Sequence, residues 1–305
     1  MAKVLITGGT GTIGSRLVKL LRNNGYEVSL VSRNPDEKKD ENVFAWDPEK
    51  RFIDPKALQG VESIIHLAGA GIADKPWSEY RKRVILESRV DSAELLLSEC
   101  KKQNIRLRNF ISASAIGWYP LIISDLIFDE NSPNGTGFLA EVCRQWEEAA
   151  DSFNDVAENV AKIRIGLVLS KGEGALKEIS LPVKYYVAAG LGKGTQSMAW
   201  IHIHDVCRAF HHILENDLNG VYNAVGPDVI NNNDFMQILA DVMDRPLMLP
   251  NIPEFVIRLL FGEKADLILK GVMLSSKKIQ ETGFAFDYPT LNSALMHIYS
   301  EGHSN

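Results

Sequence analysis

Segments rich in apolar residues alternate with longer amphipathic segments along the first part of the chain. The run Val61–Leu67 is predicted to be a buried parallel strand. Trp77–Cys100 is predicted to be a helix, because its apolar residues recur at helical spacing and form one stripe. This alternation predicts a doubly wound parallel sheet with right-handed crossovers, which places a ligand at the carboxyl ends of the strands. The further predicted elements are the strand Asn109–Ala115, the helix Phe138–Phe153 and the strands Ala161–Ser170 and Gly220–Val225.

A short apolar strand beginning at Val4 runs directly into a glycine-rich turn, and an amphipathic helix follows. Gly8, Gly11 and Gly14 have the spacing Gly-x-x-Gly-x-x-Gly, and the flanking strand and helix are the context of a dinucleotide site. Gly8 allows the tight turn, Gly11 lets the pyrophosphate approach the backbone, and Gly14 lets the helix pack close to the strand. We therefore predict a Rossmann-type fold that binds the cofactor phosphates at the helix start; the alternative is a glycine turn that binds nothing. The predicted contacts are Gly8, Gly9, Gly11, Thr12, Ile13 and Gly14.

The next predicted strand, Glu27–Arg33, indicates which dinucleotide the site prefers. An NAD site carries an acidic residue near this strand end, which binds the ribose 2′-hydroxyl. This chain has Ser32, Arg33 and Asn34 there instead. Because a guanidinium offers several donors to a 2′-phosphate, we predict NADP(H) as the cofactor. The alternative is that Arg33 is a solvated loop arginine.

The regular alternation ends after Ser170. Several glycines and Pro182 interrupt the sequence, and the part from Asn231 onward is predicted to be mostly helical. We therefore predict an NADP-binding domain of residues 1–170 plus about 200–225, and a small lobe of residues 171–199 plus 226–305. Gln196 and Trp200 are expected to line a substrate pocket of this second lobe.

Composition narrows the class of protein. The chain has 305 residues, 45% of them hydrophobic, and a formal net charge of −6, which argues against nucleic acid or an anionic membrane as a main partner. Its three cysteines are widely spaced, and no apolar run approaches about 20 residues, so we predict a cytoplasmic protein without a membrane span. The amphipathic stretch Phe255–Phe261 is expected to pack in the core or to form a dimer contact, which leaves a homodimer open.

Three further motifs carry a resemblance to a known family. Together with the glycine turn, Ile65–Gly69, Ile111–Ala115 and Trp200–Val206 resemble motifs of the extended short-chain dehydrogenase/reductase superfamily, the NAD-dependent epimerase/dehydratase proteins. The end of the chain, Gly283–Leu291, is similar to the small C-terminal domain of one atypical, uncharacterised subgroup. This resemblance implies NADP contacts from Ser32, Arg33, Leu67, Ala68, Arg89 and Val168, with Gly69 and Ser112 in the same motifs.

The resemblance fails at two catalytic positions. Active members of the superfamily carry Tyr-x-x-x-Lys on the helix after the serine strand, where Tyr moves a proton and Lys lowers the pKa of Tyr and holds the nicotinamide ribose. Counted from Ser114, these positions fall on Leu139 and Cys143, and the helix Phe138–Phe153 contains neither Tyr nor Lys. Ser114 itself is kept as a residue that could polarise a carbonyl group.

Another residue would then have to supply the proton. Tyr119 lies on the loop that leaves the serine strand, at the sheet edge where catalytic groups belong. We predict Ser114 and Tyr119 as the catalytic residues and Trp118 as a pocket wall. The alternative is that Tyr119 is a packing aromatic before Pro120.

The sequence gives weaker support for metal binding or for a redox-active cysteine. His202 and His204 have the spacing of a two-ligand strand motif, but no further ligand completes a set, so we predict no metal and expect alternating strand residues. Cys143 is expected to be a buried structural cysteine rather than a redox thiol. Two functions remain: an NADP(H)-dependent oxidoreductase or epimerase-like enzyme acting on a small carbonyl or sugar-like substrate, and a non-catalytic protein that reports NADPH or redox state to a partner.

Overall fold

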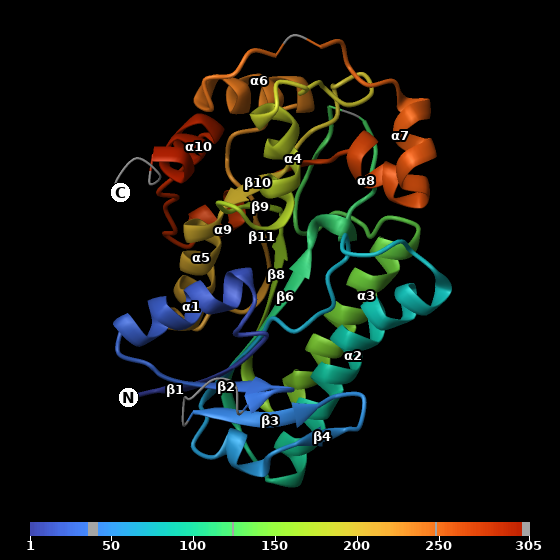
Figure 1. The fold of residues 1–305 in the computed structure, drawn as a ribbon. Coiled ribbons are helices and arrows are strands. Elements are labelled where there is room, and N and C mark those ends of the chain that lie inside the picture. Colours follow the sequence, from blue (N-terminus) through green and yellow to red (C-terminus); the bar gives the residue numbers. More distant parts are fainter. Residues whose placement is uncertain (36–41, 124, 248, 301–305) are drawn as a thin grey trace. The chain divides into compact units, whose positions relative to one another are not determined.

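The computed structural model describes residues 1–35, 42–123, 125–247 and 249–300 (Figure 1). Within these residues the largest sheet has eight strands in the order β11-β8-β6-β5-β1-β2-β3-β4. β1 pairs in parallel with β2 and β5, β5 with β6, and β2 with β3, whereas β3 and β4 are antiparallel. The predicted doubly wound parallel sheet is confirmed. Its strands are β1 (Lys3–Thr7), β2 (Glu27–Ser32), β3 (Val43–Asp47), β4 (Phe52–Ile53), β5 (Ser63–His66), β6 (Leu107–Ala115), β8 (Ala157–Ile165) and β11 (Gly220–Ala224).

The centre of this sheet positions the candidate site. Val4, Leu5 and Ile6 of β1 are completely buried, as expected for a central parallel strand covered by helices on both faces. The strand order changes direction here, because β2 follows on one side of β1 while β5 and β6 lie on the other. Ligands of such sheets bind outside the carboxyl ends of the strands at this point.

Three α-helices of the described residues pack with this part of the sheet: α1 (Thr12–Asn23), α2 (Glu79–Lys102) and α3 (Phe138–Asp151). α1 buries Leu17 and Leu21 on one face. α2 begins after Ser78, whose side chain accepts a hydrogen bond from the backbone N–H of Arg81. α2 and α3 lie side by side, and α3 also contacts β6 (Figure 1). Short 3₁₀ helices are η2 (Pro55–Leu58), η3 (Ile116–Trp118) and η4 (Ser152–Asp155).

Two stacked aromatic rings lie in the buried core of unit 1. The rings of Phe110 on β6 and Phe153 on η4 are nearly parallel, with centroids 3.5 Å apart, and both side chains are completely buried. They belong to an apolar cluster that also contains Trp46, Leu58 and Leu96. Because these residues come from five elements, the cluster joins strands and helices far apart in the sequence.

The chain divides into two compact units. Unit 1 comprises Met1–Trp118, Thr136–Arg164 and Cys207–Tyr222, and unit 2 comprises Tyr119–Gly135, Ile165–Val206 and the chain from Asn223. α5 (Ile203–Glu215) begins in unit 2 and ends in unit 1. The predicted domain boundaries stay a prediction.

Unit 2 is mostly helical, and its short strands form two parallel pairs within the described residues, β9 with β10 and β7 with β12. Its core gathers Trp200, Phe235, Leu239, Leu291 and Leu295. The strands are β7 (Ile127–Phe128), β9 (Leu167–Leu169), β10 (Trp200–His202) and β12 (Met273–Leu274), and the helices are α4 (Gly174–Lys184), α6 (Asn232–Val242), α7 (Glu254–Phe261), η5 (Gly262–Lys264), α8 (Ala265–Leu269), α9 (Lys277–Glu281) and α10 (Leu291–Ser300). None of the helices in the described ranges is long and apolar enough to cross a membrane.

A buried carboxylate anchors the last part of unit 2. Asp205 is completely buried, and its two oxygens accept hydrogen bonds from the backbone N–H groups of Asp287 (2.9 Å) and Tyr288 (3.0 Å). Two N–H donors satisfy both oxygens of a carboxylate that the fold has removed from water. Asp205 therefore fixes the segment that leads into α10.

Two sequence predictions are corrected here, and two strands were missed. The predicted strand Ala161–Ser170 is two strands, since Gly166 separates β8 from β9 and donates its N–H to Ala224. His204 is not a strand residue: β10 ends at His202, and His204 lies in the first turn of α5. β3 and β4 were not predicted, although β3 has four consecutive apolar residues; β4 is only two residues long.

Candidate functional site

The glycine turn between β1 and α1 is shaped by two backbone contacts. Gly8 has φ +67°, and a Cβ atom there would lie 2.8 Å from the carbonyl oxygen of Leu67. A Cβ atom on Gly14 would lie 2.3 Å from the carbonyl oxygen of Gly8. The fold therefore requires glycine at both positions.

Gly11 is glycine for a different reason. Its backbone is extended, with φ −76° and ψ 178°, and a Cβ atom there would meet only the carbonyl oxygen of Gly8, at 3.4 Å. The protein itself thus leaves the space above Gly11 open. Gly11 is also the N-cap of α1, which has no side-chain cap and no acidic residue in its first turn, so the positive end of this helix faces that space. The arrangement fits a phosphate group.

Thr7 connects the turn to the next strand. Its buried hydroxyl oxygen accepts hydrogen bonds from the backbone N–H groups of Leu67 and Ala68, both at 3.1 Å. This holds the predicted cofactor segment Leu67–Gly69 against the carboxyl end of β1. Sequence reasoning missed Thr7, although its place directly before Gly8 was a usable signal.

On the other side of β1, the end of β2 carries the residues predicted to select NADP(H). Ser32 accepts a hydrogen bond from the backbone N–H of Asn34 (3.1 Å), which tightens the turn after the strand. Arg33 is exposed and forms no ion pair with any residue of the described ranges. Val168, the remaining implied cofactor contact, lies on β9 of unit 2.

Arg89 of α2 is a buried cation at the carboxyl end of β5. Its Nη1 donates to the carbonyl oxygens of Ala70 (3.1 Å) and Ile85 (2.8 Å), and Nε is buried without a partner. Its guanidinium carbon lies 4.9 Å from the ring centroid of Trp146. Burial lowers the pKa of Arg89 to about 10, so the side chain remains charged at neutral pH.

A neutral histidine lies beneath this edge. The Nε2 atom of His66 is 2.8 Å from the hydroxyl oxygen of Ser92, which itself donates to the carbonyl of Ser88. Nδ1 accepts a long hydrogen bond from the indole N–H of Trp146 (3.5 Å) and lies equally far from the Ser112 hydroxyl. These contacts assign the proton of His66 to Nε2. Burial, and then the nearby charge of Arg89, lower the pKa of His66 to about 3.

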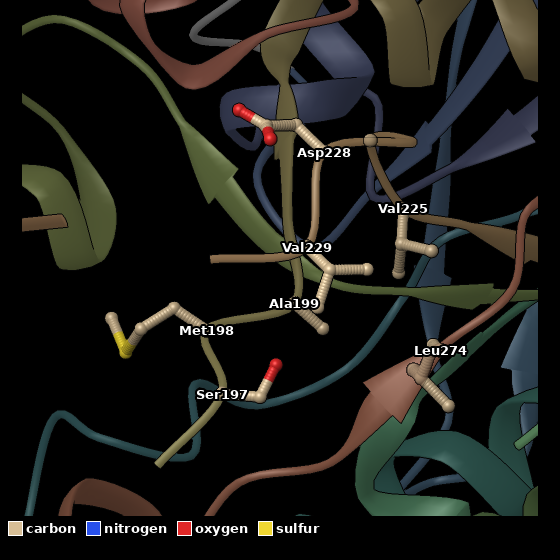
Figure 2. A pocket seen from close by; sticks show the side chains of 8 residues that line it. Ser197, Met198, Ala199, Val225, Asp228, Val229 and Leu274 are labelled. Atoms are coloured by element: carbon tan, nitrogen blue, oxygen red, sulfur yellow. The ribbon is translucent and has the colours of Figure 1, made fainter. Parts of the chain in front are cut away.

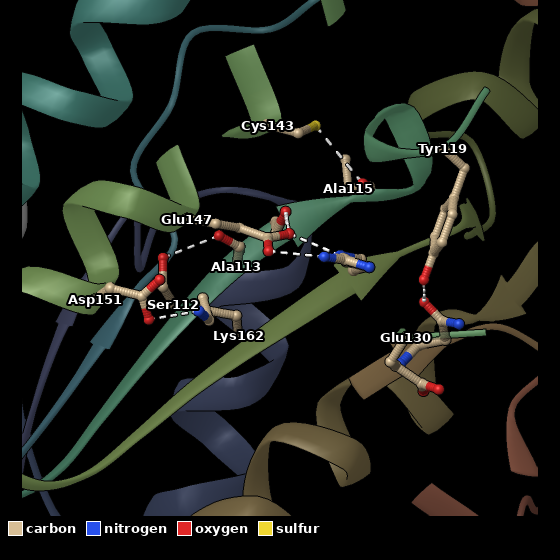
Figure 3. A network of polar contacts seen from close by, with 12 residues as sticks. Ser112, Ala113, Ala115, Tyr119, Glu130, Cys143, Glu147, Asp151 and Lys162 are labelled. Carbon is tan, nitrogen blue, oxygen red and sulfur yellow. Dashed lines mark hydrogen bonds and ion pairs between the residues drawn. The ribbon is translucent and has the colours of Figure 1, made fainter. Parts of the chain in front are cut away.

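Ser114 belongs to a buried polar network in unit 1 that includes Glu147, which Figure 3 labels. Its hydroxyl donates to Oε1 of Glu147 at 2.7 Å. Arg164 donates to the same carboxylate from Nε (2.8 Å) and Nη2 (2.9 Å), and its guanidinium carbon lies 3.9 Å from the ring centroid of Trp118. The Ser114 proton is thus directed to Glu147, and Arg164 lies over the Trp118 ring.

In unit 2, the hydroxyl of the buried Tyr119 donates to the Asn223 side chain at 2.7 Å. Asn223 is held in turn by Glu130, whose carboxylate accepts its backbone N–H at 2.7 Å (Figure 3). Gln196 donates to the carbonyl oxygens of Leu191 and Ile268, so its amide connects two backbone segments.

The indole N–H of Trp200 donates to the carbonyl oxygen of Asp228 at 3.2 Å. A small, shallow pocket lies nearby in unit 2 (Figure 2). Neither Gln196 nor Trp200 is among its lining residues, which are Ser197, Met198, Ala199, Val225, Gly226, Asp228, Val229 and Leu274.

The two positions without Tyr and Lys lie at the start of α3. The Cys143 thiol donates to the carbonyl of Ala115 (3.6 Å), and burial raises its pKa to about 12, so it is protonated at neutral pH. A Cβ atom on Gly117 would lie 3.3 Å from Cβ of Leu139 and 3.4 Å from Sγ of Cys143. η3 therefore packs closely on this face of α3. Among the described residues, no group of three or more His, Cys, Asp or Glu side chains is arranged to hold a metal ion.

Comparison with known proteins agrees with this architecture. Residues 4–136 match the NAD dependent epimerase/dehydratase family, and residues 252–298 match a domain of unknown function, DUF1731. An epimerase family protein of Staphylococcus aureus is 32% identical over 99% of this chain and 100% of its own length. The chain belongs to the epimerase family. A second epimerase family relative, the chloroplastic SDR39U1 homolog of Arabidopsis thaliana, is 35% identical over 97% of this chain and 86% of its own.

Two solved structures share the fold. The human epimerase family protein SDR39U1 (isoform 2), crystallised with NADPH, has a TM-score of 0.88 and 30% identity and covers 98% of this chain and 99% of its own. MoeE5, in complex with UDP-glucuronic acid and NAD, has a TM-score of 0.76 at 20% identity, over 99% of this chain and 100% of its own. At that identity the likeness shows the fold alone. The predicted family, with its C-terminal domain of unknown function, is confirmed.

The buried His66 predicts how stability depends on pH. Its pKa of about 3 is below the usual 6.5, so between these values the unfolded chain binds a proton that the folded chain does not. Stability from this group is complete above pH 6.5 and falls on acidification. We expect protonation of His66 in the unfolded chain to lower the free energy of unfolding by about 2 kcal/mol when the pH falls from 7 to 5. Urea unfolding at pH 7 and pH 5 should show that His66→Gln loses less unfolding free energy on acidification than the native protein.

The matched control is His204→Gln, since His204 is partly exposed. This variant should keep the pH dependence of the native protein. An equal loss in His66→Gln and the native protein would contradict the assignment of a neutral, buried His66.

Proposed function

We propose that this epimerase family protein binds NADP(H) at the glycine turn and acts as an epimerase or reductase on a small carbonyl or sugar-like substrate. The open space above Gly11, at the uncapped N-terminus of α1, is the observation that carries the cofactor assignment. The residues present fit the cofactor, since a phosphate needs such a cradle and Arg89 offers a buried N–H without a partner. The human relative crystallised with NADPH supports this choice.

The end of β2 is suited to the 2′-phosphate of NADP(H). An exposed Arg33 beside Ser32, at the end of the strand next to β1, is suited to a phosphate and offers no carboxylate to a free ribose hydroxyl. NADP(H), when bound, supplies or accepts a hydride. The protein's own task is then to hold the cofactor and to manage a proton at the substrate oxygen.

Ser114 and Tyr119 remain the proposed groups for that task. For Ser114 to polarise a carbonyl, its proton must move from Glu147 to the substrate, and for Tyr119 to donate a proton, it must leave Asn223. Both exchanges break a short hydrogen bond to a buried partner.

A second candidate function follows from those same bonds. Leu139 and Cys143 cannot transfer protons at neutral pH, and the Ser114 and Tyr119 hydroxyls are held internally. These observations favour a non-catalytic protein that binds NADPH and reports NADPH or redox state to a partner. The net charge of −6 supports a small-molecule ligand over nucleic acid or membrane, and we keep the cytoplasmic location and the homodimer as proposals.

Cofactor preference gives the first test. NADPH should bind at least about tenfold more tightly than NADH, a difference of about 1.4 kcal/mol. Arg33→Ala should remove most of this preference, because it deletes the contact to the 2′-phosphate. Calorimetric titration of both dinucleotides measures it, with the exposed Arg83→Ala as control. Equal affinities in the native protein would rule out the Arg33 assignment.

The space above Gly11 gives the second test. Gly11→Val should abolish dinucleotide binding and keep the fold, since the backbone is extended and only one atom lies within reach of the new Cβ. Gly14→Ala is the contrasting variant and should lower the melting temperature, because its Cβ would collide with the carbonyl of Gly8. Binding retained by a folded Gly11→Val protein would mean that the phosphates lie elsewhere.

Catalysis gives the third test. The protein is incubated with NADPH and a panel of carbonyl compounds and sugar nucleotides while the nicotinamide absorbance is followed. If a substrate is found, Ser114→Ala and Tyr119→Phe should each lower turnover by about 10²-fold, and Cys143→Ala by less than about threefold. Full activity of Tyr119→Phe would overturn its role, and no turnover across the panel would favour the non-catalytic function.

A further inference from the structure

Arg81 lies in the first turn of α2 and is tied to the segment that leaves β5. Its backbone N–H donates to the Ser78 hydroxyl at 3.2 Å, which caps the helix. Its side-chain Nη2 donates to the carbonyl oxygen of Gly71. The segment of residues 67–78 runs from the carboxyl end of β5 to the start of α2, so Arg81 is held at the edge where sheets of this type bind ligands.

Most of the hydrogen-bond donors of Arg81 have no partner. Within the described residues Nη2 is the one nitrogen of its guanidinium that forms a hydrogen bond, and Nε is buried without one. Only 13% of the side chain is exposed, so little of it is in contact with water. A guanidinium has five N–H donors in a rigid, planar fork, and leaving a buried donor unsatisfied is unfavourable. The unused part of this fork fits two oxygen atoms of one anion.

The acidic partner of Arg81 does not satisfy this fork. Oδ2 of Asp74 lies 3.8 Å from Nη2, which is beyond hydrogen-bond distance, and the Asp74 side chain is 66% exposed. Asp74 folds back over Gly71, where a Cβ atom would lie 2.1 Å from Oδ2. Because an ion pair with an exposed carboxylate contributes little to stability, an incoming anion displaces Asp74 at low cost.

The charges around Arg81 favour an anion. Between residues 75 and 89 the chain has five Lys or Arg and two Glu, although its net charge is −6. Arg81, Lys82 and Arg83 follow one another near the start of α2, where the helix dipole is positive and cations are unfavourable. Burial, and to a smaller extent the charge of Arg81, lower the pKa of Arg89, so the two guanidinium groups repel each other. A bound anion reduces this repulsion.

Two aromatic rings lie at the end of the same loop. The rings of Trp77 and Phe138 meet edge to face with centroids 5.1 Å apart, and the Trp77 indole N–H donates to the carbonyl oxygen of Ile72 at 3.0 Å. Both rings are half-buried, and Nζ of Lys82 lies 5.8 Å from the Phe138 ring centroid. Apolar ring faces and cations therefore lie together at this loop, as a site for a sugar-like molecule with an acidic group requires.

We propose that Arg81 and the loop of residues 71–77 bind a carboxylate or phosphate group, and that the substrate of this protein carries such a group. Two oxygens of the anion accept hydrogen bonds from Nε and a terminal nitrogen of Arg81 and displace Asp74. In the proposed function the cofactor phosphates bind at the glycine turn and at Arg33, so this anion is a separate one. The substrate assignment rests on the proposed function, whereas the anion site itself does not.

The experiment is an NMR titration of the ¹⁵N-labelled protein saturated with NADPH, because the cofactor then occupies the glycine turn. The probes are glucuronate, glucose 1-phosphate and, as the neutral control, glucose. We expect a dissociation constant of about 1 mM for at least one anion and no measurable binding of glucose. The backbone amides of residues 71–77 and the Nε–H of Arg81 should shift on binding. The anion that binds identifies the acidic group as a carboxylate or a phosphate.

Three variants separate Arg81 from its surroundings. Arg81→Lys keeps the charge but loses the fork, so it should weaken the anion by about tenfold, and its spectrum assigns the missing Nε–H signal. Asp74→Asn should tighten the anion by about threefold, since the competing carboxylate is removed. Arg83→Met, at an exposed arginine of the same helix, should change the affinity by less than about twofold. NADPH affinity should stay within about twofold in all three variants.

The proposal is wrong if neither anion binds, if glucose binds as tightly as the anions, or if Arg81→Lys binds the anions like the native protein. An equal loss in Arg83→Met would also overturn it, because the anion would then respond only to a basic surface. If Arg81→Lys does not fold, Asp74→Asn decides: an unchanged or weaker anion affinity in that variant contradicts the displacement of Asp74 and overturns the proposal.

A native protein that does not bind NADPH would overturn the proposed function and, with it, the assignment of the anion to a substrate. The anion site is then tested by the same titrations of the cofactor-free protein. Gly11→Val removes any binding of the probes at the glycine turn, and the remaining binding should still depend on Arg81. Loss of all anion binding in Gly11→Val would show that Arg81 forms no site of its own.

Discussion

The buried ion pair between Glu147 and Arg164 fixes how α3 lies on the sheet. Both side chains are almost completely buried, and every carboxylate oxygen has a donor from Arg164, with Ser114 sharing one of them. Asp151, one helical turn after Glu147, pairs with Lys162, two residues before Arg164 on β8. A helix that slid along β8 would leave buried charges unpaired, which costs several kcal/mol. The directions of Leu139, Cys143 and Trp146 depend on this register.

The same register places the ring of Trp146 on α3 next to the guanidinium of Arg89 on α2. Trp146 is held with its ring beneath Arg89, and a guanidinium above an aromatic face is stabilised by cation–π attraction. Arg89 also packs against Gly69, whose missing side chain makes the approach feasible. The Trp146 ring and the Gly69 backbone thus together fix the position of the Arg89 guanidinium.

The sequence identifies Ser114 and Tyr119 as candidate catalytic residues, but the fold decides which partner each hydroxyl group bonds. A motif identifies Ser114 and its place at the end of a strand, but the direction of its proton depends on Glu147, 33 residues away. For Tyr119 the partner is Asn223, 104 residues away. The amide of Gln196, a predicted pocket residue, connects two backbone segments of unit 2. The sequence gives the type of each of these side chains, but the fold decides which hydrogen-bond partner it has.

The sequence by itself determined the features that depend on neighbours along the chain. The alternation of strands and helices, the glycine turn and the arginine after β2 are local patterns, because periodicity and backbone strain act over a few residues. Only the tertiary structure decided the break at Gly166, the helical position of His204 and the pairing of β3 and β4. It also decided that Arg164 has an acidic partner and Arg89 has none within the described residues. Burial and hydrogen-bond partners arise from residues far apart in sequence, so charge and proton availability at this site are properties of the folded chain.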